Sequence, residues 1–277
     1  MSQPTVSIIM LTYGHEKYIE KAIRSVFMQK TNFDCELIIA NDNSPDNTDV
    51  VVKKVILDAP ENISVRYVKH EKNMTMNPNF LWALKECKGK YIALCEGDDY
   101  WLDDHKLQKQ VDFMDKNSDF SMYFHKSQDD HAKILQDLET KIYSEQEILN
   151  SWYIHTASVL FPNSFEEPDY KLLASDKIHF YDLILFLILA NKGKVWGTNE
   201  NMSFYRYIET SITNTSKKIE YYESLFNHLD LISTIYDSKY KPYNKHRVKS
   251  QAYKLFRHYA LKGNPKTIKY LLHYIKN

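Results

Sequence analysis

The chain has 277 residues, of which 43% are hydrophobic, and its 36 basic and 36 acidic side chains give a formal net charge of zero. This composition predicts a folded globular protein and excludes a disordered chain. No signal-peptide pattern is present, the longest apolar run is too short to cross a bilayer, and three scattered cysteines favour a reducing cytoplasm over a disulfide framework.

Strands and helices alternate along the first part of the chain. Apolar runs typical of strands occupy residues 6–11, 36–40, 64–68 and 91–95, and segments typical of helices occupy residues 17–29, 46–57, 79–87 and 105–116. Because helices of this length connect successive strands, we expect a mostly parallel sheet with crossover helices. The strands are almost continuously apolar, which predicts that both faces of the sheet are covered.

Beyond residue 118 the pattern is less regular. We expect strands at residues 121–125 and 158–161, a polar, weakly patterned segment near 126–145, an apolar helix at 182–191, and short strands around residues 195 and 204. From about residue 218 the chain is expected to be helical. The spacing i, i+3, i+4, i+7 of an apolar helix face is found at Ile268, Leu271, Leu272 and Ile275. We therefore predict two regions, residues 1–215 and residues 216–277.

The two predicted regions differ in charge. Residues 239–277 hold eleven Lys or Arg and no Asp or Glu, whereas the rest of the chain holds 25 basic and 36 acidic side chains. Cationic helices with Tyr and Phe suit an anionic membrane surface. The alternative is a set of solvated helices that pack on the N-terminal region or on a second subunit of a homo-oligomer. We do not expect nucleic acid as a partner, because no recognised binding motif accompanies the charge.

Glycine is scarce, with six residues in the whole chain. No two of them have the spacing of a G-x-G-x-x-G or Walker loop. The sequence therefore excludes the commonest dinucleotide- and ATP-binding loops, and a bound nucleotide would need a different kind of site.

Polar loops follow the predicted strands at residues 12–15, 41–48, 72–73 and 96–99. The carboxyl ends of parallel strands meet at one edge of a sheet, so these loops are expected to share one crevice. In the last loop, Glu96 and Asp98 are alternate residues of an extended segment, and their carboxylates can converge on a hard cation such as Mg²⁺ or Mn²⁺. The alternative is an ordinary acidic turn.

Four segments in order resemble glycosyltransferase family 2. They are Val6-Ser-Ile-Ile-Met-Leu-Thr-Tyr, Tyr18-Ile-x-x-Ala-Ile-x-Ser-Val26, Asp42-x-Ser-x-Asp-x-Thr48, and residues 89–101, which end in Glu-Gly-Asp-Asp-Tyr-Trp. The resemblance covers roughly residues 4–210. It implies the GT-A nucleotide-sugar-binding fold, with a C-terminal helical extension here, and metal-dependent, inverting sugar transfer. The Glu-Gly-Asp-Asp-Tyr-Trp form is similar to the branch that assembles bacterial capsule, O-antigen and other surface glycans.

The resemblance assigns nucleotide contacts to the first three loops. Thr12 and Tyr13 are expected to meet the uracil and the ribose, and Asp42 to accept a hydrogen bond from the uracil imide N–H. Asn73 and Asn79 fall in the stretch that lines the base pocket in the family. Either asparagine is equally explained as a turn or cap residue.

The carboxylate cluster and one arginine are expected to handle the diphosphate. The resemblance makes Asp98 the first metal ligand, with Glu96 bound directly or through water, and Mn²⁺ or Mg²⁺ as the cofactor. Asp99 is expected to orient the site or to face the donor sugar. Arg206 matches an arginine near the diphosphate, where its forked guanidinium can pair with phosphate oxygens.

The acceptor side is expected to contain a base and a sugar platform. Asp182 begins an apolar helix that ends in Gly-Lys, as the family's base does, and the helix N-terminus favours its ionised form. Asp176 is the second candidate for the base. Trp101 is expected to form a stacking floor for a sugar, and Thr156 to lie at the acceptor side.

Together these features predict a cytoplasmic enzyme that moves a sugar from a UDP-sugar to a hydroxyl of a glycan or lipid-linked glycan, at the inner face of the cell membrane. One alternative is a sugar-nucleotide pyrophosphorylase, but that class needs a glycine- and Lys/Arg-rich loop after the first strand, which residues 12–16 do not supply. The other is an inactive module that binds glycan or membrane.

Overall fold

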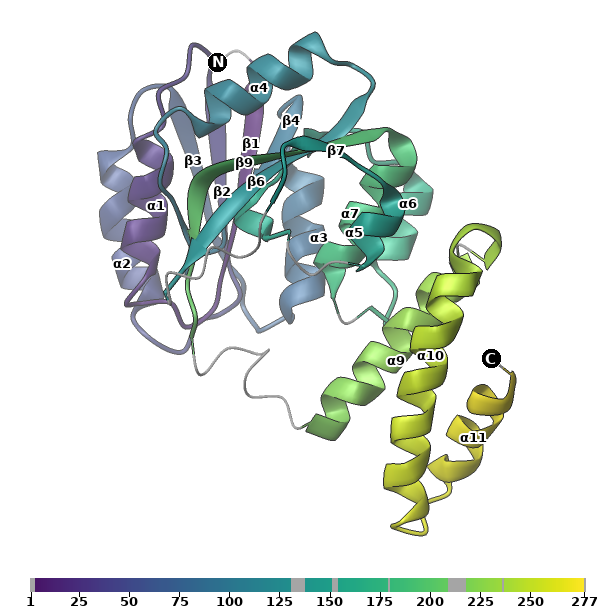
Figure 1. The fold of residues 1–277 in the computed structure, drawn as a ribbon. Coiled ribbons are helices and arrows are strands. Elements are labelled where there is room, and N and C mark those ends of the chain that lie inside the picture. The colour runs from purple at the N-terminus through teal and green to yellow at the C-terminus, as the bar shows by residue number, and fades with distance from the viewer. Residues whose placement is uncertain are drawn as a thin grey trace. The chain divides into compact units, whose positions relative to one another are not determined.

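The computed structural model describes residues 3–130, 138–150, 154–178, 180–208, 218–235 and 237–276. The chain forms two compact units (Figure 1). The first unit comprises Met1–Leu172 and Leu185–Tyr207, and the second comprises Leu173–Ile184 and Ile208–Asn277. The predicted boundary between residues 215 and 216 lies outside the described residues.

The first half of the first unit has the predicted parallel sheet. Its strands are β1 (Val6–Thr12), β2 (Cys35–Asn41), β3 (Ile63–Lys69) and β4 (Tyr91–Leu94). The helices of this half are α1 (Ile19–Phe27), α2 (Thr48–Val55), which continues into η1 (Ile56–Asp58), α3 (Met76–Glu86) and α4 (Lys106–Lys116). In the register of the sheet, Thr12 pairs with Asn41 and Asn41 with Lys69, so these three strands end at the same level. The loops that follow them therefore emerge at one edge, as expected.

The second half of this unit is mixed. It adds β5 (Tyr100–Trp101), β6 (Phe120–Asp129), β7 (Lys141–Tyr143), β8 (Leu160–Pro162) and β9 (Lys194–Tyr205). The strand order among the described residues is β3-β2-β1-β4-β8-β6-β9-β5, with β7 also paired to β9. β8 runs antiparallel to β4 and β6, and β5 and β7 run antiparallel to β9, whereas β6 and β9 are parallel. The architecture is a mixed α/β fold whose parallel part is β1–β4.

Several elements of this half were not predicted. They are β5, β7, α5 (Glu145–Asn150), η2 (Thr156–Ser158) and α6 (Glu167–Leu173). The strands expected around residues 195 and 204 are the two ends of one strand, β9. Its middle, residues 199–201, is polar and exposed, which interrupts the apolar pattern without interrupting the strand.

The core of the first unit lies on both faces of the parallel strands. Every residue of β1, β2 and β4 is buried, which explains why these strands have no polar alternation. α1 turns one apolar face to the same core through Ile19, Ile23 and Val26. Burial of these groups on both faces fixes the position of the loops at the carboxyl edge.

The second unit contains the end of the chain. Its helices include α9 (Lys218–Ile235), α10 (Asp237–Ala260) and α11 (Lys266–Lys276), while α7 (Tyr181–Lys192) begins in this unit and ends in the first. Gly263, in the left-handed region at φ +59°, allows the tight turn between α10 and α11. The core of this unit includes Phe226, Leu229, Leu255 and Tyr270. Within the described residues, no helix combines the length and the apolar character that crossing a membrane requires.

Candidate functional site

Side chains of the loop after β2 hold the loop after β1 in place. Three consecutive backbone N–H groups, those of Gly14, His15 and Glu16, donate to Ser44 Oγ (3.0 Å), Thr48 Oγ1 (2.9 Å) and Asp46 Oδ2 (3.0 Å), respectively. The acceptors are alternate residues of the Asp42-x-Ser-x-Asp-x-Thr48 motif. This explains why the motif needs an oxygen-bearing side chain at each of those positions: it fixes the loop that begins at Thr12.

Asp42 lies at the centre of this edge. Its Oδ1 accepts a hydrogen bond from the Met74 backbone N–H at 2.6 Å, and its own N–H donates to the Thr12 carbonyl at 3.0 Å. Thr12 is buried, and its Oγ1 has no hydrogen-bond partner among the described residues. Tyr13 is exposed beside it. The structure thus brings together three of the predicted nucleotide contacts, Thr12, Tyr13 and Asp42.

The two predicted asparagines differ in their surroundings. Asn73 is exposed, and its Oδ1 accepts from the Thr75 N–H at 2.8 Å, so it stabilises the turn before α3. Asn79 is buried, donates to the Ala40 carbonyl at 3.1 Å, and has its Oδ1 2.9 Å from His70 Nε2. Its amide thus links α3 to the end of β2, and its predicted place in the base pocket stays a prediction.

Glu96, Asp98 and Asp99 form a compact carboxylate cluster, with oxygen atoms that all lie within 4.8 Å of one another. Asp99 is only 1% exposed, and burial, followed by the charges of Asp98 and Glu96, raises its pKa well above the usual range. Its Oδ2 is buried without a hydrogen-bond partner in the described part of the chain. Oxygen donors, concentrated negative charge and an unsatisfied buried carboxylate oxygen fit a hard divalent cation.

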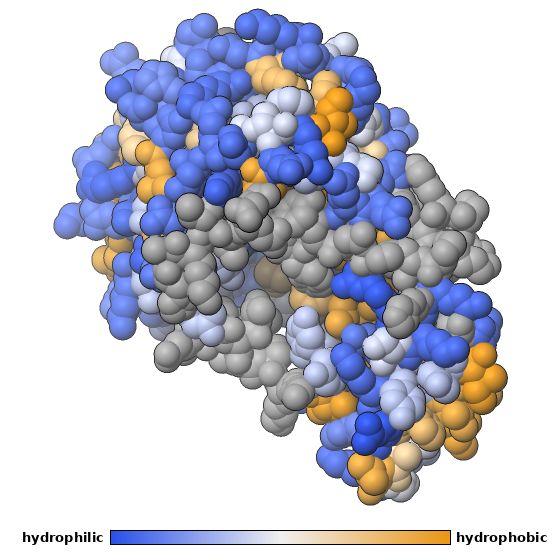
Figure 2. Space-filling model, in the orientation of Figure 1, coloured by the Kyte–Doolittle hydropathy of each residue, from blue (hydrophilic) through white to orange (hydrophobic). Residues whose placement is uncertain are grey.

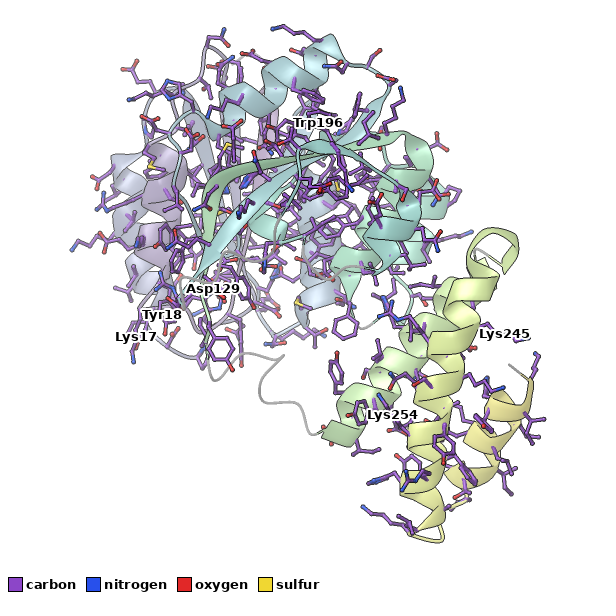
Figure 3. All side chains as sticks on the ribbon, viewed as in Figure 1. Lys17, Tyr18, Asp129, Trp196, Lys245 and Lys254 are labelled. Atoms are coloured by element: carbon purple, nitrogen blue, oxygen red, sulfur yellow. The ribbon has the colours of Figure 1, made fainter. Side chains whose placement is uncertain are left out.

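Arg206 joins the carboxylate cluster from the far end of β9. Its backbone N–H donates to Asp99 Oδ1 and its Nε–H to the Asp98 carbonyl, both at 2.9 Å. Its guanidinium lies 4.7 Å from the ring centroid of Tyr18, which is labelled in Figure 3, and 5.5 Å from that of Tyr100. The antiparallel pairing of β5 with β9 brings these distant segments together. Asp99 thus holds the backbone of Arg206, and its predicted role in orienting the site or facing the donor sugar stays a prediction.

His15 was not assigned a role from the sequence, although its loop was singled out. Its Nε2 lies 3.7 Å from Asp98 Oδ2, and its Nδ1 is buried without a hydrogen-bond partner among the described residues. The imidazole also limits the space at Gly97, where an added Cβ would lie 2.9 Å from His15 Nδ1. The only sequence signal for this contact is the position of His15 at the same sheet edge as Asp98.

Trp101 is a core residue. Its side chain is 1% exposed, the indole N–H donates to the Ala157 carbonyl at 2.9 Å, and the Lys106 ammonium lies 4.2 Å from the ring centroid. A ring this deeply buried offers no open face for a sugar, so the predicted stacking floor is wrong. Thr156, at the start of η2 and next to Ala157 in the sequence, is buried, and its predicted place at the acceptor side stays a prediction.

Asp182 lies in the first turn of α7 and is half-buried. Its Oδ1 accepts from the Leu183 N–H at 2.9 Å, but burial outweighs this bond and raises the pKa of Asp182. The helix N-terminus therefore does not lower the pKa, contrary to expectation. Asp176, the second candidate for the base, is exposed.

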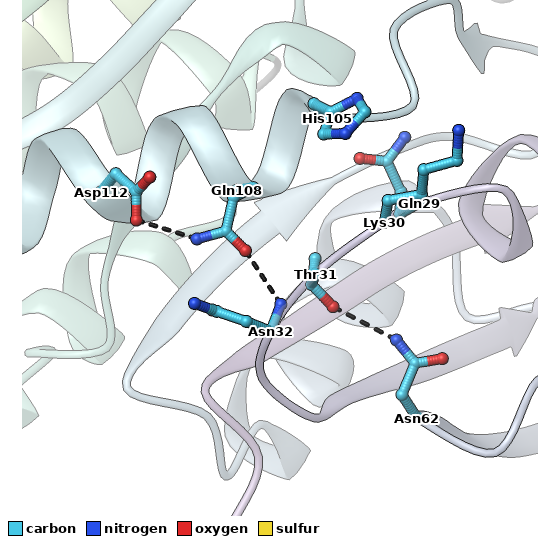
Figure 4. A pocket seen from close by; sticks show the side chains of 8 residues that line it. All are labelled: Gln29, Lys30, Thr31, Asn32, Asn62, His105, Gln108 and Asp112. Carbon is cyan, nitrogen blue, oxygen red and sulfur yellow. Dashed lines mark hydrogen bonds between the residues drawn. The ribbon is translucent and has the colours of Figure 1, made fainter.

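A separate pocket lies near the amino ends of β2 and β3 and has a volume of about 790 Å³ (Figure 4). It is lined by polar side chains, namely Gln29, Lys30, Thr31, Asn32, Asn62, His105, Gln108 and Asp112. Hydrogen bonds from the Asn32 N–H to Gln108 and from Asn62 to Thr31 cross it. The acidic residues near His105 are already paired, Asp103 with Lys109 and Asp104 with Lys30. No predicted site residue lines this pocket.

Comparisons with known proteins identify the family of the chain. The family model described as "Glycosyl transferase family 2" matches residues 7–167. The chain is 30% identical over 73% of its length to a protein of Mycobacterium tuberculosis, of which it spans 58%. It is 29% identical over 78% of its length to the putative teichuronic acid biosynthesis glycosyltransferase TuaG of Bacillus subtilis, covering 84% of that protein.

Two further similarities concern nucleotide sugars. The chain is 35% identical over 44% of its length to the Escherichia coli UDP-Glc:alpha-D-GlcNAc-diphosphoundecaprenol beta-1,3-glucosyltransferase WfgD, and covers 46% of it. The crystal structure of S. aureus TarS with UDP-GlcNAc matches 98% of the chain and 79% of that structure's chain, with a TM-score of 0.68 at 16% identity. The second match shows the same GT-A fold. The family model covers more than half of the length of this chain, and the chain therefore belongs to glycosyl transferase family 2.

Proposed function

We propose that the chain catalyses inverting transfer of a sugar from a UDP-sugar to a hydroxyl of a surface glycan, with the help of a divalent cation. One observation carries the proposal: the Glu96–Asp98–Asp99 carboxylate cluster is bonded to Arg206. The buried Asp42 follows β2, and the carboxylate cluster follows β4. Both strands pair with β1 in the same parallel sheet, so the two sites share its carboxyl edge. A nucleoside diphosphate needs both a polar base contact and a charge-neutralising diphosphate contact.

The uridine would bind between the loops after β1 and β2. The hydrogen bond from Met74 uses one of the two oxygens of Asp42, and the imide N–H of uracil is a suitable donor to this carboxylate. The exposed ring of Tyr13 can stack on the base, and the buried Thr12 hydroxyl can hydrogen-bond the nucleoside. Asn73, beside Met74, remains a proposed pocket residue.

The diphosphate would bind at the carboxylate cluster. Asp98, with Glu96 directly or through water, would hold Mn²⁺ or Mg²⁺, and such a cation supplies Lewis-acid stabilisation of charge on a departing diphosphate. Arg206 would pair with phosphate oxygens, because Asp99 and the Asp98 carbonyl already fix its direction. His15 would hold the Asp98 carboxylate in place.

The acceptor hydroxyl requires a base, for which we propose Asp182. Burial raises the pKa of this carboxyl, and a raised pKa makes the ionised form a stronger proton acceptor. Thr156 is proposed to contact the acceptor or donor sugar.

The acceptor is proposed to be a surface glycan, either free or linked to a lipid. Support comes from TuaG, named for teichuronic acid biosynthesis, and from WfgD, whose named acceptor carries diphosphoundecaprenol. We further propose that the enzyme works at the inner face of the cell membrane, which its basic C-terminal helices contact.

The test is a panel of nucleotide sugars, screened for UDP release in the presence of Mn²⁺. We expect turnover of a UDP-sugar by the native chain and its loss in Asp98→Ala. The control is Asp112→Ala, which removes an exposed carboxylate from the separate polar pocket. UDP release that is unchanged by Asp98→Ala, or absent with every UDP-sugar while UDP itself does not bind, contradicts the proposal.

A further inference from the structure

The outward side of α11 carries exposed aliphatic side chains. Ile268, Leu272 and Ile275 are 66%, 61% and 69% exposed, and Leu261, just after α10, is 86% exposed. The three helical residues are spaced i, i+4, i+7 and lie on one face of the helix. Figure 2 shows hydrophobic atoms gathered on the surface of the C-terminal helices. We call Ile268, Leu272 and Ile275 the outer face of α11.

α11 packs on the rest of the second unit through a different side of the helix. On the inner side of α11, Tyr270 is buried. Its ring centroid lies 5.2 Å from that of Phe226, in an edge-on arrangement, and 5.7 Å from that of Tyr259, in a stacked arrangement. The Tyr270 hydroxyl donates to Glu223 at 2.9 Å. An apolar helix stripe normally faces the core. Here a second stripe, with no cover among the described residues, faces outward.

The surroundings of the outer face are cationic. Lys262, Lys269 and Lys276 are exposed on or next to α11, and residues 239–277 contain no acidic side chain. On the inner side of α11, Glu223 of α9 pairs with Lys266 at 2.9 Å, and Asp230 of α9 lies 3.8 Å from His273. The Lys269 ammonium lies 5.2 Å from the ring centroid of Tyr270 and 5.8 Å from that of Phe226, so this lysine flanks the outer face.

α10 carries further exposed basic side chains. Lys245 and Lys254, both labelled in Figure 3, are exposed on this helix, and the Lys254 ammonium lies 5.1 Å from the ring centroid of Tyr222 on α9. The exposed ring of Tyr253 lies 5.3 Å from that of Tyr274 on α11, and the Arg257 guanidinium lies 5.9 Å from the Tyr253 ring. Tyrosine rings next to basic side chains are typical of the boundary between apolar lipid and polar headgroups.

We infer that the outer face of α11 is a docking surface for an anionic lipid bilayer. Its aliphatic side chains would enter the boundary between headgroups and acyl chains, and the surrounding lysines would contact the lipid phosphates. This inference rests on the proposed function to the extent that a lipid-linked acceptor explains why the enzyme needs the surface. It places the contact on three aliphatic residues of α11, and so goes beyond the general basic character of the C-terminal region.

Charge favours a bilayer over a second copy of the chain. If two copies met through their outer faces, Lys262, Lys269 and Lys276 of each would face those of the other, with no acidic group within residues 239–277 to offset them. An anionic bilayer supplies the complementary charge and an apolar layer together. The two occupants give different results in the experiment below.

The experiment is co-sedimentation of the full chain with vesicles of phosphatidylcholine mixed with phosphatidylglycerol, without nucleotide. We expect binding that weakens with salt and is lost with pure phosphatidylcholine. The triple variant Ile268→Gln, Leu272→Gln, Ile275→Gln should bind at least roughly tenfold more weakly at the same net charge. A second variant, Lys262→Glu, Lys269→Glu, Lys276→Glu, should abolish binding without removing apolar surface.

Matched controls separate this surface from exposed apolar residues in general. The double variant Val50→Gln, Leu57→Gln changes exposed side chains of the first unit and should bind vesicles like the native chain. Circular dichroism should show native helix content in every variant. Vesicle binding that is unchanged in both triple variants overturns the inference. A native dimer that the glutamine variant dissociates, with no vesicle binding, overturns it in favour of a second copy.

UDP release from a UDP-sugar, measured on the same preparations, keeps the two proposals distinct. Vesicle binding with no UDP release contradicts the proposed function and supports the docking surface. UDP release with no vesicle binding supports the proposed function and contradicts the docking surface.

Discussion

The two units of the chain place side chains in opposite unusual positions. In the first unit, polar groups are buried at the sheet edge: Asp42, Asp99 and the Thr12 hydroxyl are all shielded from water. In the second unit, aliphatic groups such as Ile268 and Leu272 are exposed. Burying charge and exposing apolar surface both cost free energy. These two exceptions are the observations behind our proposals of a polar ligand in the first unit and an apolar layer against the second.

The largest expected effect concerns a half-buried carboxyl group. We expect Asp182→Asn to lower the rate of sugar transfer by roughly 10²–10⁴-fold, the contribution typical of a general base. UDP binding, measured by calorimetry, should stay within a factor of about two, because the amide has the same shape as the carboxyl. Near-native transfer by this variant would remove Asp182 as the base, and the Asp176→Asn variant would then be measured in the same way.

The pH profile of transfer provides the next test. A base must be deprotonated, and because burial raises the pKa of Asp182, the rate should fall on the acid side at a higher pH than an ordinary aspartate would give. Below that pKa we expect about a tenfold loss for each pH unit. A flat profile down to the usual range of aspartate would contradict this role. The acid limb should disappear from the residual activity of Asp182→Asn.

Asp99 tests whether buried charge lowers the stability of the first unit. Asp99→Asn keeps an oxygen that can accept the Arg206 N–H but removes one of three clustered negative charges. We expect the free energy of unfolding of the metal-free protein to rise by about 1 kcal/mol at neutral pH. Denaturant titration measures this change. A clear loss of stability would mean that the charge of Asp99 is compensated in the folded chain.

The smallest expected effect tests the exposed apolar face. Leu272→Gln should change the free energy of unfolding by no more than about 0.5 kcal/mol, as is usual for surface substitutions. The buried neighbour Tyr270 serves as the contrast, since Tyr270→Ala should cost roughly 3 kcal/mol or more. If both substitutions destabilise the protein to the same extent, the outer face is part of the folded core.

Features that depend on local sequence pattern could be predicted, whereas contacts between residues far apart in the sequence could not. The strands β1, β2 and β4 were predicted because each is a nearly continuous apolar run that is buried along its length, and the carboxylate cluster because strand ends share an edge. β3 alternates in polarity and is only partly buried. Trp101 was misplaced because its burial depends on a partner, Ala157, that is 56 residues away. The contact of His15 with Asp98 joins the ends of two separate strands and has no local signal.

Sequence pattern alone was also insufficient to predict how α11 packs in the second unit. The spacing of Ile268, Leu271, Leu272 and Ile275 predicted an apolar helix face, and the helix is confirmed. Three of these residues are exposed, and Leu271 is half-buried. Periodicity does not say what covers such a face, and in the structure α11 packs through Tyr270 on its other side. Only the fold shows that the predicted stripe is the exposed one.

The most direct test of the central claim is calorimetric titration of UDP into the native chain with and without Mn²⁺, repeated with Asp98→Ala. We expect Mn²⁺ to strengthen UDP binding to the native chain by about tenfold or more and to leave binding to the variant unchanged. Equal affinity with and without Mn²⁺ in the native chain, or a full Mn²⁺ effect in Asp98→Ala, would contradict the assignment of the carboxylate cluster.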